Sequence, residues 1–244
     1  MPRFFTDFSG GDIAVIKGED AVHIRRSLRL RIGDNLTLCD GRGSDYFCDI
    51  KAFDGDEVVL KVLYQKPSTC EPSIEVILYQ GLPKGDKLEL IIQKAVELGV
   101  TKIIPVEMAR SIVRISGSSD KFEKKLRRLQ KISDEAAGQS GRGILPRVEA
   151  PMSFRQALNM MGEEGTPIIA FYEGGGQRIS ELISNQTKRL SVIIGPEGGF
   201  EPSEIEQLTD IGASVATLGK RILRCETAPI AALAVIMALT GNLD

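Results

Sequence analysis

Hydrophobic and polar positions follow two different rhythms along the chain. In the N-terminal part, short apolar segments are separated by turns such as Asp54-Gly55-Asp56; the segments lie at residues 12–15, 35–39, 46–50 and 57–62. Short strands at such spacing predict a small antiparallel β-barrel, interrupted by one helix over about residues 20–28. Residues 66–73, where prolines flank small and polar residues, predict a linker. We therefore expect a first domain over residues 1–68.

From residue 73 onward, strand patterns alternate with helix patterns. Strands are predicted at residues 74–80, 103–106, 167–171, 190–194 and 214–218. The last three are apolar almost without interruption, as is typical of parallel strands buried on both faces. Helices are predicted at about residues 88–98, 122–137, 202–211 and 228–239, with another beginning at the capping box of Ser153 and Gln156. The pattern predicts an α/β domain with a mainly parallel sheet over residues 73–244.

Composition narrows the setting in which the protein works. The 244 residues, 42% of them hydrophobic, can bury one large core or two modest ones. No apolar run approaches 18 residues and no apolar segment opens the chain, so we expect a soluble, cytoplasmic protein without a membrane span. The four cysteines are scattered and only one histidine, His23, is present. We therefore expect reduced thiols and no metal site.

Positive charge gathers in two segments although the net charge is -2. Four arginines lie within residues 25–31 without an acidic residue, and six lysines and arginines lie within residues 121–131. One such run is as often a solvated helix face as a phosphate-binding surface, but two in one chain favour contact with RNA. A polar segment at residues 139–142 could also line a pocket for RNA. The candidate RNA-binding residues are Arg25, Arg26, Arg29, Arg31, Lys124, Lys125, Arg128 and Arg142.

Three glycine-bearing loops follow the last three predicted strands, at residues 172–176, 195–200 and 219–227. Open α/β sheets bind ligands at the carboxyl ends of their strands, and glycine lets a backbone approach a ligand closely. A single loop of this kind is usually only a tight connection, whereas three together indicate a binding site. Neither a G-x-G-x-x-G fingerprint nor a P-loop is present, which disfavours a dinucleotide.

Two of these segments closely resemble the paired motifs of the SPOUT methyltransferases. They are Gly-Pro-Glu-Gly-Gly-Phe at residues 195–200 and Leu-Gly-Lys-Arg-Ile-Leu-Arg-Cys-Glu-Thr-Ala at residues 218–228. The resemblance is strongest to the RsmE family, which makes N3-methyluridine in small-subunit ribosomal RNA. Residues 3–5, 23–34, 93–100 and 135–142 extend it over nearly the whole chain. Cys225 and Pro229 depart from the pattern, where a small hydroxyl residue and a small apolar residue are expected, and this bears on how the last helix starts.

The resemblance implies a PUA-like barrel followed by a SPOUT domain whose C-terminal segment threads a trefoil knot. It also implies S-adenosylmethionine as cofactor, a homodimer with the sites at its interface, and 16S ribosomal RNA of the small subunit as substrate. The cofactor-binding residues that it implies are Phe171, Gly195, Glu197, Gly198, Leu218, Gly219 and Leu223.

Methylation at N3 requires uracil to lose a proton before its nitrogen can attack the methyl group. A cation beside the base would favour the uracil anion, and a carboxylate could accept the proton. We predict Arg224 as the cation and Glu197 or Glu226 as the acceptor. Glu226 could instead favour the start of the last helix through the helix dipole, and Glu197 could merely orient its loop.

Two other functions remain open from the sequence. One is a non-catalytic RNA-binding or ribosome-assembly module with the same fold, against which the glycine loops and Arg224 count. The other is a nucleotide-dependent α/β oxidoreductase, against which the missing dinucleotide fingerprint counts. Binding of S-adenosylmethionine would distinguish the methyltransferase from both, and binding of a dinucleotide in its place would favour the oxidoreductase. The residues themselves leave open the target nucleotide and whether free ribosomal RNA or an assembled subunit is methylated.

Overall fold

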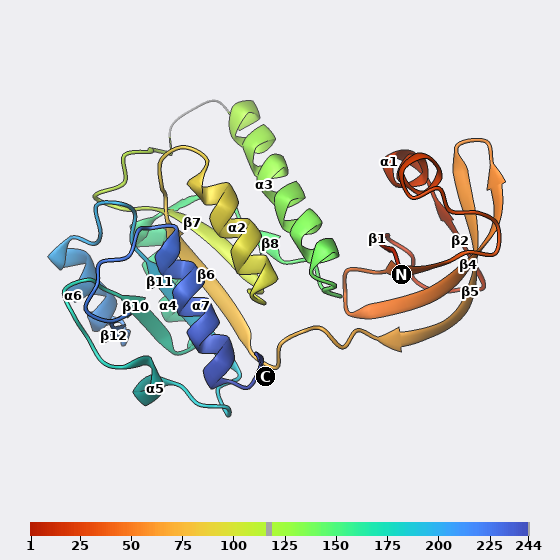
Figure 1. The fold of residues 1–244 in the computed structure, drawn as a ribbon. Helices are drawn as coiled ribbons and strands as arrows, with labels where there is room; N and C mark the ends of the chain where they lie inside the picture. The colour runs from red at the N-terminus through yellow and green to blue at the C-terminus, as the bar shows by residue number, and fades with distance from the viewer. Residues whose placement is uncertain (116–118, 244) are drawn as a thin grey trace. The chain divides into compact units, whose positions relative to one another are not determined.

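The chain folds into two compact units. The computed structural model describes residues 1–115 and 119–243, without the side chains of residues 119–122. The first unit consists of Met1–Glu71 together with Ala137–Leu145, and the second of Pro72–Ala136 and Pro146–Asp244 (Figure 1). The return of residues 137–145 to the first unit has no counterpart in the sequence pattern, because it depends on contacts between residues far apart in the chain.

The first unit is built on a five-stranded sheet. In order across the sheet, its strands are β1 (Arg3–Phe5), β3 (Asn35–Cys39), β4 (Ser44–Asp54), β5 (Glu57–Pro67) and β2 (Ile13–Ile16). β1 pairs with β3 in parallel, and the other neighbours are antiparallel. Alternate residues face a core that contains Ile24, Leu36, Leu38 and Leu60, all fully buried. β5 extends to Pro67 and so includes the beginning of the predicted linker.

The predicted helix over residues 20–28 is in fact two short helical turns. α1 (Gly18–Val22) continues directly into a π-helix, η1 (His23–Ser27). Arg29, just beyond, has a φ of 53°, a left-handed conformation that is uncommon for a residue with a side chain. π-helical turns and such strained residues are both found more often than average at functional sites.

The second unit contains a seven-stranded sheet in which every pairing is parallel. The strand order is β12 (Ser214–Ala216), β10 (Ile168–Phe171), β11 (Arg189–Ile194), β6 (Glu75–Gly81), β7 (Lys102–Glu107) and β8 (Arg147–Val148), and β9 (Met152–Ser153) also pairs with β7. Ile77, Ile104 and Ile193 are fully buried on these strands. The predicted fold class, a parallel α/β domain after a small mainly antiparallel β domain, is confirmed.

Helices connect the strands of this sheet. They are α2 (Lys87–Glu97), α3 (Ser119–Gln139), α4 (Phe154–Glu164), α5 (Ile179–Leu182), α6 (Pro202–Asp210) and α7 (Thr227–Leu239). α2 and α7 pack side by side (Figure 1). The predicted capping box is present at α4, where the Ser153 side chain accepts a hydrogen bond from Gln156 N. Within the described part of the chain, no helix combines the length and apolar character needed to cross a membrane.

The register of the last strands brings three loops to one edge of the sheet. β10 lies between β11 and β12, and all three run parallel, so their carboxyl ends meet. β12 ends at Ala216, two residues earlier than predicted, which leaves Thr217 and Leu218 in the following loop. The three glycine-bearing loops are therefore neighbours in space.

Candidate active site

A cavity of about 500 Å³ lies at this edge of the second unit. It is lined by residues 171–173 after β10, 194–199 after β11 and 217–225 after β12, with Lys87 and Ala228 completing the wall. All of the predicted cofactor-binding residues line it: Phe171, Gly195, Glu197, Gly198, Leu218, Gly219 and Leu223. Arg224 lines it as well, whereas Glu226 lies just behind the wall and contacts Lys87. The volume falls within the usual range for a small-molecule site.

Two glycines in these loops are required for different reasons. A Cβ built on Gly198 would lie 2.7 Å from the Cβ of Arg110, so packing against Arg110 is what excludes a side chain there. Arg110 also donates to the Gly198 carbonyl at 2.9 Å and pairs with Glu201 at 2.8 Å. Gly219 differs, because its φ is +99° and a Cβ there would meet no protein atom within 4 Å. A side chain at Gly219 would have only open space to enter.

A single lysine joins the predicted carboxylates. The Nζ atom of Lys87, in the first turn of α2, lies 3.0 Å from Glu197 Oε1 and 3.3 Å from Glu226 Oε2. It also donates to Cys225 Sγ at 3.7 Å. Glu197 Oε1 accepts a further hydrogen bond, from Lys84 N at 3.0 Å. The side chains of Lys87, Glu197 and Glu226 are 33%, 27% and 19% exposed, so the cluster is partly accessible to solvent.

These contacts fix the protonation states of the cluster. Partial burial alone would raise the pKa of Glu197, but the hydrogen bonds from Lys84 N and Lys87 outweigh it and hold the pKa below its usual value. The thiol of Cys225 donates to Glu226 at 3.2 Å and, with Lys87, lowers the pKa of Glu226. Burial and this hydrogen bond raise the pKa of Cys225 to about 12. At neutral pH both carboxylates are therefore ionised, and the thiol is protonated.

Arg224 is held by its backbone and not by its side chain. Its carbonyl accepts hydrogen bonds from the backbone N–H groups of Thr227 and Ala228, which fixes the start of α7. The side chain is exposed at the cavity wall, and within the described ranges of the chain its guanidinium makes no hydrogen bond or ion pair. It is available to a bound ligand. Pro229 is accommodated in the first turn of α7, where a missing N–H costs little.

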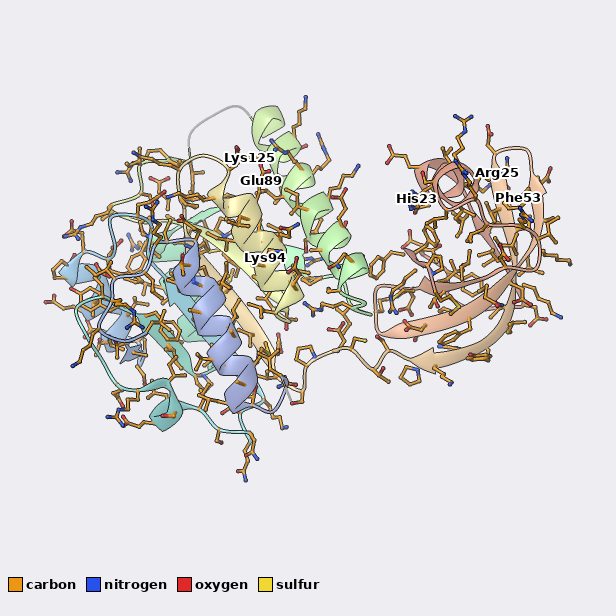
Figure 2. The ribbon with its side chains drawn as sticks, viewed as in Figure 1. His23, Arg25, Phe53, Glu89, Lys94 and Lys125 are labelled. Atoms are coloured by element: carbon orange, nitrogen blue, oxygen red, sulfur yellow. The ribbon has the colours of Figure 1, made fainter. Side chains whose placement is uncertain are left out.

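The predicted RNA-binding arginines of the first unit fall into two groups. Arg26, Arg29 and Arg31 are exposed. Arg25 is half-buried: its guanidinium stacks 4.8 Å from the centre of the Phe53 ring and donates to the carbonyl of Glu57 (Figure 2). Arg25 is thus partly committed to packing, while the other three are free to meet a phosphate backbone.

The remaining RNA candidates are also placed differently from one another. Lys124 and Lys125 are exposed on α3, and Arg128 pairs with Glu89 at 2.8 Å. The side chain of Lys121 lies outside the described residues. For Arg142 the structure differs from the prediction of an RNA contact. Its side chain is only 4% exposed and pairs with Glu71 at 2.7 Å inside the first unit. A guanidinium so buried and paired serves the packing of residues 137–145 and cannot reach a phosphate.

Three residues that hold the cavity loops in place were not predicted from the sequence: Lys87, Arg110 and Glu201. Lys87 follows β6, and β6 lies beside β11, so its helix begins at the same edge as the glycine loops. A K-G-D-K segment after a predicted strand was visible in the sequence. The order of strands in the sheet, which places that segment beside the glycine loops, could not be predicted from the sequence.

Comparison with known proteins identifies the family to which the chain is similar. A family model described as an RNA methyltransferase domain matches residues 70–237, and one described as an RNA methyltransferase PUA domain matches residues 16–63. The ribosomal RNA small subunit methyltransferase E of Bacillus subtilis is 38% identical over 97% of this chain and 96% of its own length. That of Mycobacterium tuberculosis is 31% identical over 96% and 89%. A crystal structure of the Neisseria gonorrhoeae protein of the same name, bound to S-adenosyl methionine, superposes with a TM-score of 0.87 at 32% identity, covering 98% of each chain.

The fold, the cavity and the matching family models define an RNA methyltransferase domain accompanied by a PUA domain. The chain belongs to the family of ribosomal RNA small subunit methyltransferase E. The family and the enzyme class predicted from the sequence are confirmed.

Proposed function

We propose that this protein transfers a methyl group from S-adenosylmethionine to N3 of a uridine in 16S ribosomal RNA of the small subunit. The observation that carries the proposal is the cavity at the carboxyl ends of β10, β11 and β12, with an exposed arginine on its wall. Relatives of the same family are named as methyltransferases of the small subunit ribosomal RNA, and one was crystallised with S-adenosyl methionine. Membership of this family favours an enzyme over a non-catalytic RNA-binding module.

The residues of the cavity fit the cofactor. Phe171, Leu218 and Leu223 offer apolar surface for an adenine, and the backbone at Gly219 faces open space. When bound, S-adenosylmethionine supplies an electrophilic methyl group on a sulfonium. The protein's own part is to orient the base and to stabilise the charge that develops on it.

Arg224 is the residue that we assign to this charge. Uracil becomes nucleophilic at N3 only as it loses its proton, and a guanidinium beside the base favours the resulting anion. Glu197 and Glu226 remain candidates for accepting that proton. Their ion pairs with Lys87 and their lowered pKa values make them weak bases, so we favour a role for both in holding the loops.

RNA capture falls to the exposed cations. Phosphate contacts from Arg26, Arg29 and Arg31 in the first unit, and from Lys124 and Lys125 on α3, would position the substrate without reading its sequence.

We also propose a homodimer in the cytoplasm. Ile222, an apolar side chain that is 85% exposed beside the cavity, would then be covered by the second copy.

Substitution of Arg224 tests the catalytic assignment. Arg224→Ala should lower the single-turnover rate of methylation by about 10²–10³-fold at saturating cofactor, the usual cost of losing one group that stabilises developing charge. Arg224→Lys should recover only part of the rate, because an ammonium lacks the planar fork of a guanidinium. Cofactor affinity and melting temperature should stay close to wild type. A well-folded alanine variant with a normal rate would remove Arg224 from the mechanism.

A further inference from the structure

Lys87 is the point at which three segments of the second unit meet. The residue belongs to the first turn of α2, Glu197 to the loop after β11, and Glu226 to the N-terminal cap position of α7. An ammonium has three N–H donors, and here they have three partners: the two carboxylates and Cys225 Sγ. No other contact in the described part of the cavity wall joins the loop at 195–199 to the loop at 217–226 through a side-chain ion pair.

We propose that Lys87 is a positioning residue that clamps the two cofactor loops together and thereby sets the affinity for S-adenosylmethionine. The inference rests on the proposed function, since the loops that it joins are those assigned to the cofactor. It adds a residue that lies outside both cofactor motifs of the sequence.

The charges explain why the clamp needs a cation. Glu197 and Glu226 both lie within ion-pair distance of the same nitrogen atom, so without Lys87 two negative charges would face each other in a partly buried place. Their repulsion would push the loops apart, and binding of a ligand that needs both loops would have to overcome it. A partly exposed ion pair contributes little by itself, but this cation is shared between two carboxylates and offsets their mutual repulsion.

Other charged groups line the same cavity and must be considered in any pH experiment. They are Glu173 after β10 and Lys220, Arg221 and Arg224 on the loop before α7. In the clamp, the contacts of Glu197 and Glu226 hold the pKa values of both carboxyls below their usual value.

The clamp predicts a change of sign in the pH dependence of cofactor binding. In the wild type, the ion pairs are present above the lowered pKa values of the glutamates and are lost as the pH falls through them, so affinity should decrease on acidification. In Lys87→Met, the facing carboxylates repel each other and acidification protonates one of them. At pH 7.5 the affinity of Lys87→Met for S-adenosylmethionine should be about tenfold lower than that of the wild type, which is within the usual range of coupling between a ligand and another site. That loss should shrink as the pH falls.

Calorimetric titration of S-adenosylmethionine into the full chain, from pH 7.5 down through the lowered pKa values of Glu197 and Glu226, tests this. Lys84→Met is the matched control: it removes an exposed lysine three residues away whose backbone, not its side chain, contacts Glu197. It should bind like the wild type. The double variant Lys87→Met with Glu226→Gln should regain most of the affinity, because the repulsion is gone.

Each outcome decides between explanations. If Lys87→Met loses affinity equally at every pH, Lys87 contacts the cofactor directly and the clamp is wrong. If it binds as the wild type does, the clamp is also wrong, although the proposed function stands. If the wild type itself does not bind S-adenosylmethionine, the proposed function fails first. Should Lys87→Met not fold, wild-type affinity that stays unchanged as the pH falls through the lowered pKa values of Glu197 and Glu226 would overturn the clamp.

Discussion

The arginine segment at residues 26–31 of the first unit and the Lys87 cluster of the second unit hold their charged side chains in opposite ways. In the second unit, Lys87 is engaged with two carboxylates at the cavity. In the first unit, Arg26, Arg29 and Arg31 extend into solvent. The difference matches two tasks. Chemistry on a bound cofactor needs groups that are fixed before the reaction begins, whereas capture of a phosphate backbone needs only cations that can give up their water and counterions.

Arg142 also belongs to the first unit, but unlike the exposed arginines its side chain is buried and paired. Its substitution should have the largest effect on stability. Its guanidinium and the carboxylate of Glu71 form a buried pair, and Glu71 also accepts the backbone N–H groups of Gly143 and Ile144. Arg142→Ala leaves that carboxylate buried without its cation, which typically costs about 3–5 kcal/mol. Hydrogen exchange should show the destabilisation in the first unit only.

A matched substitution separates this effect from the mere removal of an arginine. Arg147→Ala removes an arginine whose side chain is 76% exposed and whose ion pair with Glu149 is long, at 3.8 Å. Its effect should stay within about 0.5 kcal/mol. If the two variants were equally stable, Arg142 would be a solvated residue and free to contact RNA.

Substitution of Gly219 should have the next largest effect, on the affinity for the cofactor. Gly219→Val places a branched side chain on the cavity wall, where no protein atom lies within 4 Å, and should lower cofactor affinity by at least about tenfold, or 1.4 kcal/mol. Gly212→Val is the control, because Gly212 also has a positive φ, +88°, and open space around it but does not line the cavity. Calorimetry on both variants isolates the steric effect from the backbone strain that they share. Equal affinities would place the cofactor elsewhere.

The sequence could predict which loops line the cavity, because each loop directly follows its strand. The loops after β10, β11 and β12 each carry their glycines next to their strand, so an apolar run followed by Gly-Pro-Glu-Gly-Gly could be interpreted without a structure. Lys87 and Arg110 could not be found in this way, because each acts through a strand order that links residues about 90 to 140 positions apart. Arg142 misled for the same reason, since its partner Glu71 is distant in sequence.

Substitution of the exposed arginines should give the smallest effect per residue. The effect is on RNA binding and is seen when affinity is measured at several salt concentrations. In a variant with Arg26→Gln, Arg29→Asn and Arg31→Gln, the slope of log affinity against log salt should fall by about 0.7–0.9 for each phosphate that is no longer neutralised. Asparagine is chosen at Arg29 because it tolerates the left-handed backbone found there. Arg25 is left in place because it packs on Phe53.

The matched control removes three exposed cations of the second unit that belong to neither predicted RNA-binding set: Arg155, Arg178 and Lys188. Filter binding of 16S ribosomal RNA at several salt concentrations compares the two variants. The first should show the shallower slope with unchanged affinity for the cofactor. Identical slopes in both would mean that the arginine segment does not contact RNA.

The central claim is that this chain methylates N3 of a uridine with S-adenosylmethionine. The most direct measurement incubates the purified protein and the cofactor with small ribosomal subunits that lack base methylation, and then maps the 16S ribosomal RNA by mass spectrometry of nuclease fragments and nucleosides. We predict a single new methyl group, on N3 of one uridine, that is absent without cofactor. A methyl group on a ribose or at another ring atom, or none at all from a protein that binds the cofactor, would contradict the account.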